Sequence, residues 1–377
     1  MVEGPPRRLD QATCGNKLFR AVLQTLLAAF AAPEPPLATA QQDLLLAQDA
    51  RLNDLDPATP STLPPSPEIL ETCFLTEEDV AEQVAILVGC AAQDQGPRAT
   101  MEDTYILQNS LALSWVGAPP SRSGIYAVFD GHCGGGASSF ARDNLLQFLK
   151  ESDKFPHAAQ DSLAQALSRM EASLAEVYRS NQQRALEAST WQGSPCAGPC
   201  DELGGTTALV AILMGDMLHI ANIGDCRAVL CRRNMEGQPV AIPLSTDHTP
   251  NLEIARIKAT GFEVSDNRID GIIEVARSLG DFQLSHLKHL DGQASALIAE
   301  PELRQHQVLE EDEFFILASD GFWKMHPSND AAIKEARRRL RKRLSPGAVA
   351  DELVQDVLSR NGDDNLTMIR HIATEEM

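Results

Sequence analysis

The chain has 377 residues, 43% of them hydrophobic. This is enough for a large folded core that does not need disulfide bonds to be stable. Its formal net charge of −21 repels nucleic acids and anionic membranes and suits cation binding. The eight cysteines are irregularly spaced, as in a reducing compartment, and no apolar run is long enough to span a membrane. We therefore expect a globular protein of the cytoplasm or nucleus, with no nucleic-acid partner and no membrane span.

The first 32 residues form a segment of their own. The stretch 21–32 is apolar and follows several basic residues, which is compatible with an amphipathic helix or with a cleaved secretory signal. Gln24 and Thr25 interrupt the stretch and favour the helix. Residues 33–81 are rich in proline and poor in aromatic residues, and they predict a linker.

From residue 82 onward the sequence pattern changes to short strand-like runs bounded by glycines and aspartates. This pattern predicts one folded domain over 82–377. Clear runs are 124–130, 206–214 and 217–223. The last two are joined by Gly215-Asp216, a two-residue hairpin loop in which glycine supplies the positive φ angle.

An apolar stripe predicts a long helix between these strands. Its members, spaced by three or four residues, are Leu163, Leu167, Met170, Leu174 and Val177. Hairpin-linked strands interrupted by long amphipathic helices favour an α+β fold, in which stacked antiparallel sheets are covered by helices, over a parallel sheet.

Four aspartates stand at the ends of apolar runs: Asp130, Asp225, Asp320 and Asp364. A single aspartate after a strand is usually a turn residue. If the strands are neighbours, however, their ends bring several carboxylates together, and protons or cations must neutralise the repulsion. Ligands that are all oxygen atoms favour Mg²⁺ or Mn²⁺ over Zn²⁺.

Other polar residues fit phosphate chemistry next to such cations. Arg98 lies shortly before Glu102 and Asp103 in the sequence. Its planar guanidinium can donate hydrogen bonds to two phosphate oxygens at once. His132, beside Asp130, is a candidate proton donor for a leaving alkoxide. Taken alone, Arg98 reads as a surface residue and His132 as a structural one.

Eight motifs occur in order over residues ~85–373. They are Arg98-Ala-Thr-Met-Glu102-Asp103, Val128-Phe-Asp130-Gly131-His132-Cys-Gly-Gly135, Gly204-Gly-Thr-Thr-Ala208, Ala221-Asn-Ile-Gly-Asp225-Cys-Arg227, Asp247-His-Thr-Pro250, Val275-Ala-Arg277-Ser-Leu-Gly-Asp281, Ala318-Ser-Asp320-Gly-Phe-Trp323 and Asp363-Asp364-Asn365. This series resembles the type-2C, metal-dependent Ser/Thr protein phosphatases.

The resemblance implies a β-sandwich of two antiparallel sheets flanked by helices, with two Mg²⁺ or Mn²⁺ ions at one edge. Asp130 would then bridge both ions and Gly131 would offer its carbonyl to one. Asp320 and Asp364 would hold the other.

The same resemblance implies roles for the remaining site residues. Glu102 and Asp103 would orient waters on the ions, Arg98 would hold the phosphate, and His132 would protonate the departing serine or threonine oxygen. Water activated by the ions would attack phosphorus in line, without a phosphoenzyme. Phosphoproteins would be the substrates, and we expect a monomer.

At one position the chain departs from the family pattern. Relatives commonly carry an aspartate four residues after the equivalent of Asp320, and it forms a weaker third metal site with the equivalents of Asp320 and Asp225. Lys324 stands there, and an ammonium replaces a cation's charge without being a ligand, so a third ion is not expected. Lys324 and the variant 274–277 resemble the integrin-linked-kinase-associated branch of the family.

Two further features leave alternatives open. The basic run 337–343 reads as a solvated helix face, a nuclear-import or acidic-partner patch, or a kinase recognition site for Ser345. Cys196 and Cys200 are spaced for a metal or redox role, but neither a second pair nor a histidine lies nearby.

Three functions compete at this point: an active phosphatase, a catalytically dead scaffold with the same fold, and a metal-dependent nuclease or other hydrolase. The retained acidic residues favour the first, because a scaffold has no physical need for converging carboxylates. The net charge disfavours a nuclease.

Overall fold

The computed structural model describes residues 89–111, 122–192, 203–289, 293–342, 346–360 and 362–372, all within the unit Phe74–Met377. The predicted N-terminal helix and linker lie outside the described residues, as do Cys196, Cys200 and Ser345.

One sheet contains five strands in the order β1-β15-β14-β8-β9, and every neighbouring pair is antiparallel. Its strands are β1 (Gly89–Asp94), β15 (Leu366–Ile372), β14 (Asp312–Ala318), β8 (Arg227–Arg233) and β9 (Pro239–Pro243). The central strand β14 is buried along its whole length, because it is covered on both faces.

The second sheet also contains five antiparallel strands, in the order β13-β7-β6-β3-β2. Its strands are β13 (Glu302–Gln307), β7 (Met217–Ile223), β6 (Ala208–Met214), β3 (Ser123–Phe129) and β2 (Thr104–Gln108). The loop between β6 and β7 is the predicted hairpin, and Gly215 there has a φ of 61°. The prediction that glycine supplies a positive φ angle in this loop is confirmed. A residue with a side chain would be strained in this conformation.

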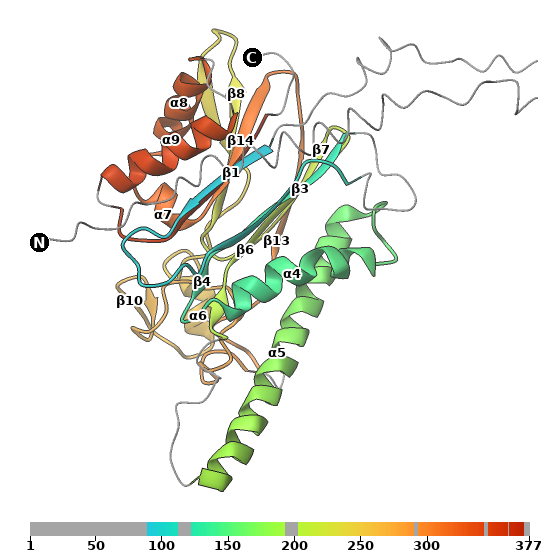
Figure 1. Cartoon of the computed structure of the whole chain (residues 1–377), viewed down its shortest axis with the longest axis vertical. Coiled ribbons are helices and arrows are strands. Elements are labelled where there is room, and N and C mark those ends of the chain that lie inside the picture. Colours follow the sequence, from blue (N-terminus) through green and yellow to red (C-terminus); the bar gives the residue numbers. More distant parts are fainter. Residues whose placement is uncertain are drawn as a thin grey trace, which may run out of the picture. The chain divides into compact units, whose positions relative to one another are not determined.

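The two sheets pack face to face, and helices cover their outer faces (Figure 1). Helices α4 (Gly136–Lys150) and α5 (Ala159–Gln192) pack on the second sheet, and α8 (Asn329–Leu340) and α9 (Pro346–Ser359) on the first. The predicted α+β sandwich is confirmed. No described helix is both long and apolar enough to cross a membrane.

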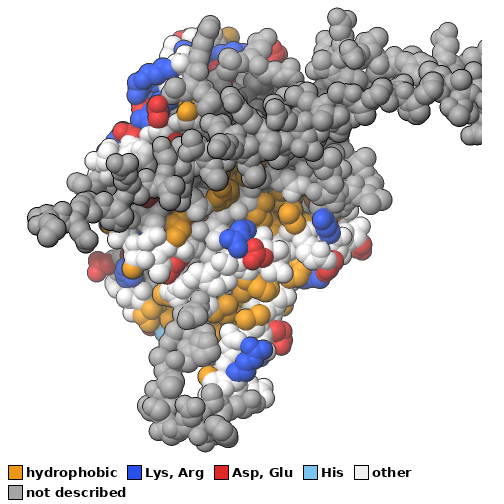
Figure 2. All heavy atoms as spheres, in the orientation of Figure 1, with side chains coloured by type: hydrophobic (Ala, Val, Ile, Leu, Met, Phe, Trp, Pro, Cys, Tyr) orange, Lys and Arg blue, Asp and Glu red, His pale blue; other side chains and the backbone are white. Residues whose placement is uncertain are grey.

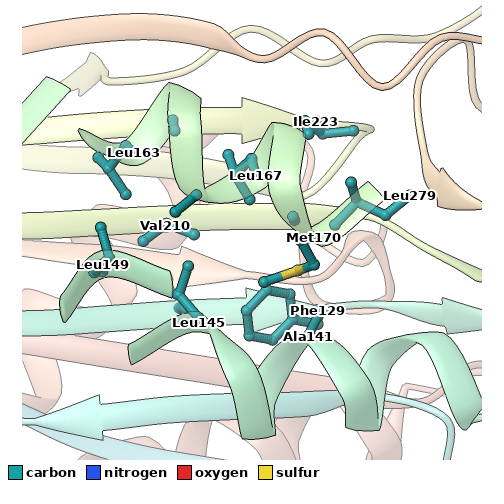
Figure 3. Close-up of a cluster of buried hydrophobic side chains, with 14 of the residues drawn as sticks. Phe129, Ala141, Leu145, Leu149, Leu163, Leu167, Met170, Val210, Ile223 and Leu279 are labelled. Atoms are coloured by element: carbon teal, nitrogen blue, oxygen red, sulfur yellow. The ribbon is translucent and has the colours of Figure 1, made fainter. Parts of the chain in front are cut away.

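The predicted apolar stripe lies on α5 and faces the second sheet. Figure 3 shows Leu163, Leu167 and Met170 of α5 meeting Phe129 of β3 and Val210 of β6. These side chains are fully buried, which is worth roughly 1.5–3 kcal/mol for each large one. The stripe is therefore core, and it fixes α5 against the sheet that carries half of the site.

Small elements crowd one edge of the sandwich. They are a three-stranded sheet of β12 (Leu279–Gly280), β5 (Gly205–Thr206) and β4 (Gly131–His132), a hairpin of β10 (Val264–Ser265) and β11 (Arg268–Ile269), and the short helices α6 (Ile254–Ala259) and α7 (Asp320–Trp323). The motifs predicted from sequence gather at this edge, because most of them follow or precede a long strand.

The basic run lies on α8, but reading it as a solvated face was wrong for two of its arginines. Arg337 is 4% exposed and forms a two-pronged ion pair with the buried Glu313, at 2.5 and 2.6 Å. Arg339 is 8% exposed and pairs with Glu335 and Asp356. Buried arginines need such partners, so these two hold α8 in place.

Among the described residues of this region, the solvent-facing basic ones are Lys334, Arg338, Arg341 and Lys342, and Arg343 lies outside the described residues. Figure 2 shows basic side chains gathered over the α8 and α9 part of the surface. An exposed basic patch therefore remains at this end of the domain, although it is smaller than the sequence suggests.

A histidine lies in the core between the sheets. The ring of His371, on β15, stacks on Phe315 with centroids 4.9 Å apart and lies 4.8 Å from Tyr126. Neither ring nitrogen has a hydrogen-bond partner in the structure as described. Burial, followed by the charges of Arg122 and Arg370, lowers the pKa of His371 to about 3, so this side chain is neutral in the native protein.

Stability is expected to fall as the pH decreases from about 6.5 towards 3, since the unfolded chain binds a proton at His371 that the native state excludes. His371→Phe keeps the ring shape and removes this titration. The free energy of unfolding of the variant minus that of the native chain, measured by urea unfolding, should increase by about 2 kcal/mol between pH 8 and pH 5. A difference that is equal at both pH values would contradict the assignment of His371 as a neutral buried histidine.

Candidate metal centre and active site

A cavity of about 670 Å³ opens at the crowded edge of the sandwich. It is lined by residues from seven of the eight sequence motifs, among them Arg98, Glu102, Asp130, Gly131, His132, Thr207, Asp225, Val275, Asp281, Asp320, Asp364 and Asn365. Segments far apart in the chain thus meet in one place.

The four predicted carboxylates come from both sheets. Asp130 follows β3 and Asp225 follows β7 in the second sheet, while Asp320 follows β14 and Asp364 precedes β15 in the first. Antiparallel pairing puts the end of β14 beside the start of β15, since Ala318 lies opposite Met368. The ends that carry Asp320 and Asp364 are therefore neighbours. In the second sheet β6 lies between β3 and β7, and both of these strands end beside the start of β6, so Asp130 and Asp225 lie at the same edge.

The carboxylates of this cluster are close enough to raise one another's pKa values. Burial raises the pKa of Asp130 well above its usual range, and Asp103, Asp320, Asp225 and Asp364 raise it further. Burial and then Asp320 raise the pKa of Asp225 to about 7, and burial raises that of Asp103 to about 6. Both carboxylate oxygens of Asp103 are buried, and the nearby hydroxyls of Thr367 and Ser319, which lower its pKa, do not offset that burial. Such a cluster is destabilising unless positive charge balances it.

Two protein cations supply part of that charge. Lys324 forms an ion pair with Asp320, and Arg98 Nη2 lies 2.9 Å from Asp364 Oδ1. Within the described ranges no three His, Cys, Asp or Glu side chains lie together in an arrangement that could hold a metal ion by themselves. The set of donors nevertheless suits Mg²⁺ or Mn²⁺, because it consists of carboxylates with unmet negative charge.

Glycine is required where the backbones converge. A Cβ on Gly131 would lie 2.4 Å from the backbone oxygen of Glu102, and one on Gly321 would lie 2.4 Å from that of Asn365. The Asn365 side chain in turn accepts a hydrogen bond from Glu102 N at 2.9 Å. These contacts hold the loop after β1, the end of β3 and the start of β15 together.

The structure places the predicted catalytic residues in two groups. Arg98 and Glu102 line the cavity, and Arg98 is also held by the carbonyl of Asp363 at 3.0 Å. Asp103 is 3% exposed and lies behind them, close enough to influence the titration of Asp130. Asp103 therefore contributes negative charge from beneath the site.

His132 has a partner that the sequence reasoning did not assign. Its Nε2 lies 2.8 Å from Asp281 Oδ2, across 149 residues of sequence. Burial lowers the pKa of His132, but Asp281 outweighs this effect and raises it. The pKa of Asp281 is in turn held below its usual range, against burial, by His132 and Lys288. The pair thus favours a protonated imidazole.

Asp281 is itself fixed from several sides. The backbone of Asp281 has a φ of 58°. Its carboxylate accepts hydrogen bonds from Ser278 at 2.6 Å and Gln283 at 3.1 Å. The carboxylate also lies so close to Gly205 that a side chain at that position would clash with it. Lys288 donates to the carbonyls of the same turn, at Ser278 and Gly280.

Helix α5 anchors this turn. Glu171 pairs with Lys288 at 2.7 Å and accepts from Gly280 N at 2.9 Å. The motif ending in Asp281 carried the only sequence signal for this role, because the contact to His132 depends on tertiary structure.

Residues 89–366 match the family model described as Protein phosphatase 2C. The chain belongs to this family. It is 37% identical over 306 residues to "Probable protein phosphatase 2C 22" of Arabidopsis thaliana, covering 80% of this chain and 72% of the relative. It is 36% identical over 280 residues to "Probable protein phosphatase 2C 57" of Oryza sativa subsp. japonica, covering 73% and 70%.

The fold of this phosphatase is similar to that in "Crystal structure of serine-threonine phosphatase 2C from Toxoplasma gondii". The TM-score is 0.59 at 19% identity, with 76% of this chain and 95% of that chain covered. The predicted family and the predicted activity as a protein serine/threonine phosphatase are confirmed, and the scaffold alternative is not favoured. The integrin-linked-kinase-associated branch stays a prediction.

Proposed function

We propose that this phosphatase hydrolyses phosphoserine and phosphothreonine in proteins with the help of two Mg²⁺ or Mn²⁺ ions. The observation that carries the proposal is the meeting of Asp130, Asp225, Asp320 and Asp364, from both sheets, in one cavity with Arg98 and His132. Asp130 and the carbonyl of Gly131 would hold one ion, and Asp130, Asp320 and Asp364 the other. When bound, the ions would acidify a water and screen the charge of the phosphate.

Arg98 is positioned to hold the phosphate. Its side chain is 55% exposed, and its ion pair with Asp364 and its bond to the Asp363 carbonyl leave other guanidinium N–H groups available. A planar guanidinium binds two phosphate oxygens at once, which orients phosphorus towards the carboxylates.

His132 is positioned to protonate the departing oxygen. It is a charged proton donor as long as Asp281 stabilises the imidazolium, and a serine or threonine alkoxide leaves poorly without a proton. Asp281 is not itself in contact with the substrate in this scheme, so it acts as a positioning residue.

The ammonium of Lys324 supports a limit of two ions. Asp320, and then Asp225 and Asp364, raise the pKa of Lys324 against the effect of burial, so it stays charged. It pairs with Asp320, one of the residues to which the family resemblance assigns a weaker third ion, and an ammonium at that carboxylate would repel a further cation.

Metal removal tests the function as a whole. The full-length chain should hydrolyse a phosphothreonine peptide when Mn²⁺ or Mg²⁺ is added and should lose this activity when a chelator is added, because the carboxylates then lack their counter-charge. Calorimetric titration with Mn²⁺ should saturate at two ions per chain. Turnover that survives complete chelation would contradict metal dependence, and a third ion of similar affinity would contradict the role of Lys324.

We further propose that the phosphatase acts on phosphoproteins as a monomer in the cytoplasm, the nucleus or both. The exposed basic residues Lys334, Arg338, Arg341 and Lys342 support nuclear entry, because import signals are basic clusters of this kind. Imaging of a fluorescent fusion before and after their replacement by glutamine tests the location, and size-exclusion chromatography with light scattering tests the oligomeric state.

A further inference from the structure

One wall of the catalytic cavity is apolar and has no part in the chemistry. It is formed by Ile272, Ile273, Val275 and Leu284, which line the same cavity as Asp130. Ile273 and Val275 are 9% and 7% exposed and belong to a buried cluster beneath the wall. Ile272 is 44% exposed. Of the exposed large hydrophobic side chains in the described part of the chain, only Ile272 lines this cavity.

The backbone holds Ile272 in place from both sides. Asp270 and Gly271, with φ of 49° and 71°, form a tight turn that is closed by Ile272 N donating to Ile269 O at 2.9 Å. Arg268 Nη1 donates to the carbonyl of Ile272 at 2.9 Å. A side chain on so constrained a loop loses little freedom when something binds to it.

The two charged side chains that line the cavity beside this wall, Arg268 and Glu274, are paired with each other. A charged group placed here would lose water without gaining a free partner, whereas an apolar group would cover the exposed face of Ile272. The charge pattern thus selects an apolar occupant.

A substrate bound with its phosphate at the carboxylates would place the chain on either side of its phosphorylated residue in the cavity that this wall lines. An extended chain advances about 3.3–3.6 Å per residue, so residues one to three positions away lie within about 10 Å of the phosphorylated one. The cavity of about 670 Å³ is large enough for a phosphorylated residue and one neighbouring side chain.

We propose that this phosphatase prefers phosphoproteins with a large apolar side chain within three residues of the phosphoserine or phosphothreonine, and that Ile272 is the residue that receives it. The inference rests on the proposed function and adds a substrate class to it.

Single-substituted phosphothreonine peptides test the preference. Leu, Ser, Arg or Asp is placed in turn at each of the three positions on both sides, and kcat/KM is measured with Mn²⁺ for the full chain, for Ile272→Ser and for Leu252→Ser. Leu252 is 67% exposed and lies outside the cavity lining, so it controls for the loss of a surface hydrophobic residue. The Leu/Ser ratio within each protein cancels changes in overall activity.

The native chain is expected to favour Leu over Ser by about 10-fold at one position or more. Ile272→Ser should reduce this ratio to about 2-fold, and Leu252→Ser should leave it unchanged. A native ratio near one, a preference for Arg or Asp, or an unchanged ratio in Ile272→Ser would overturn the inference. If the peptides are hydrolysed without any preference for Leu, this inference is wrong but the proposed function stands. If no peptide is hydrolysed, the proposed function is wrong as well.

Discussion

Asp130→Asn is expected to lower kcat on a phosphothreonine peptide by about 10³-fold. Asp130 is the carboxylate on which the other acids of the site converge, since Asp103, Asp320, Asp225 and Asp364 all raise its pKa. In the proposed scheme it shares its charge between both ions. The amide of asparagine keeps the shape of the side chain but removes that charge, so both ions should be lost or displaced.

The same variant should not unfold the protein. Without metal it removes one of several carboxylates that repel one another, so its thermal stability should equal or exceed that of the native chain. The rise in melting temperature that Mn²⁺ gives the native chain should shrink, because only bound cations stabilise the folded state. Asp161→Asn, on an exposed part of α5, is a matched control and should behave like the native chain. Near-normal turnover in Asp130→Asn would refute a site with two metal ions.

Asp281→Asn is expected to lower kcat on phosphopeptides by about 10²-fold with little change in KM. Asparagine still fits beside His132 but cannot stabilise the imidazolium, so the leaving alkoxide receives its proton less readily. The loss should be less than about 10-fold for p-nitrophenyl phosphate, whose phenolate leaves without protonation.

This dependence on the leaving group separates a role in proton donation from a purely structural role. Glu171→Gln serves as the comparison, because it loosens the turn at Gly280 without contacting His132. It should affect both substrates by similar factors. If Asp281→Asn also lowered kcat equally for both substrates, Asp281 would be only a structural support.

Much of the site was predictable because its signals are local. The hairpin at Gly215-Asp216, the stripe on α5 and the aspartates at strand ends each follow from a few neighbouring residues, and the structure places all of them as expected. Their convergence required one added assumption, that the strands are neighbours. The structure meets that condition for β14 and β15, whereas β3 and β7 lie on either side of β6 and end at the same edge of their sheet.

The misreadings have an equally physical origin. Arg337 and Arg339 look like a solvated face because a basic run is usually exposed. Glu335 lies on the same helix as Arg339, but Glu313 and Asp356, the other carboxylates that allow the two arginines to be buried, come from a strand and from another helix. The partner of His132 was missed for the same reason.

The amino-acid sequence by itself determined which chemical groups this phosphatase brings to its site and which elements carry them, since the period of the apolar residues and the turn residues act over a few positions. The tertiary structure alone decided which groups touch. Asp281 meets His132, Arg98 meets Asp364, and Ile272 lines the catalytic cavity because the packing of two sheets and their loops brings together residues whose contact no local pattern encodes.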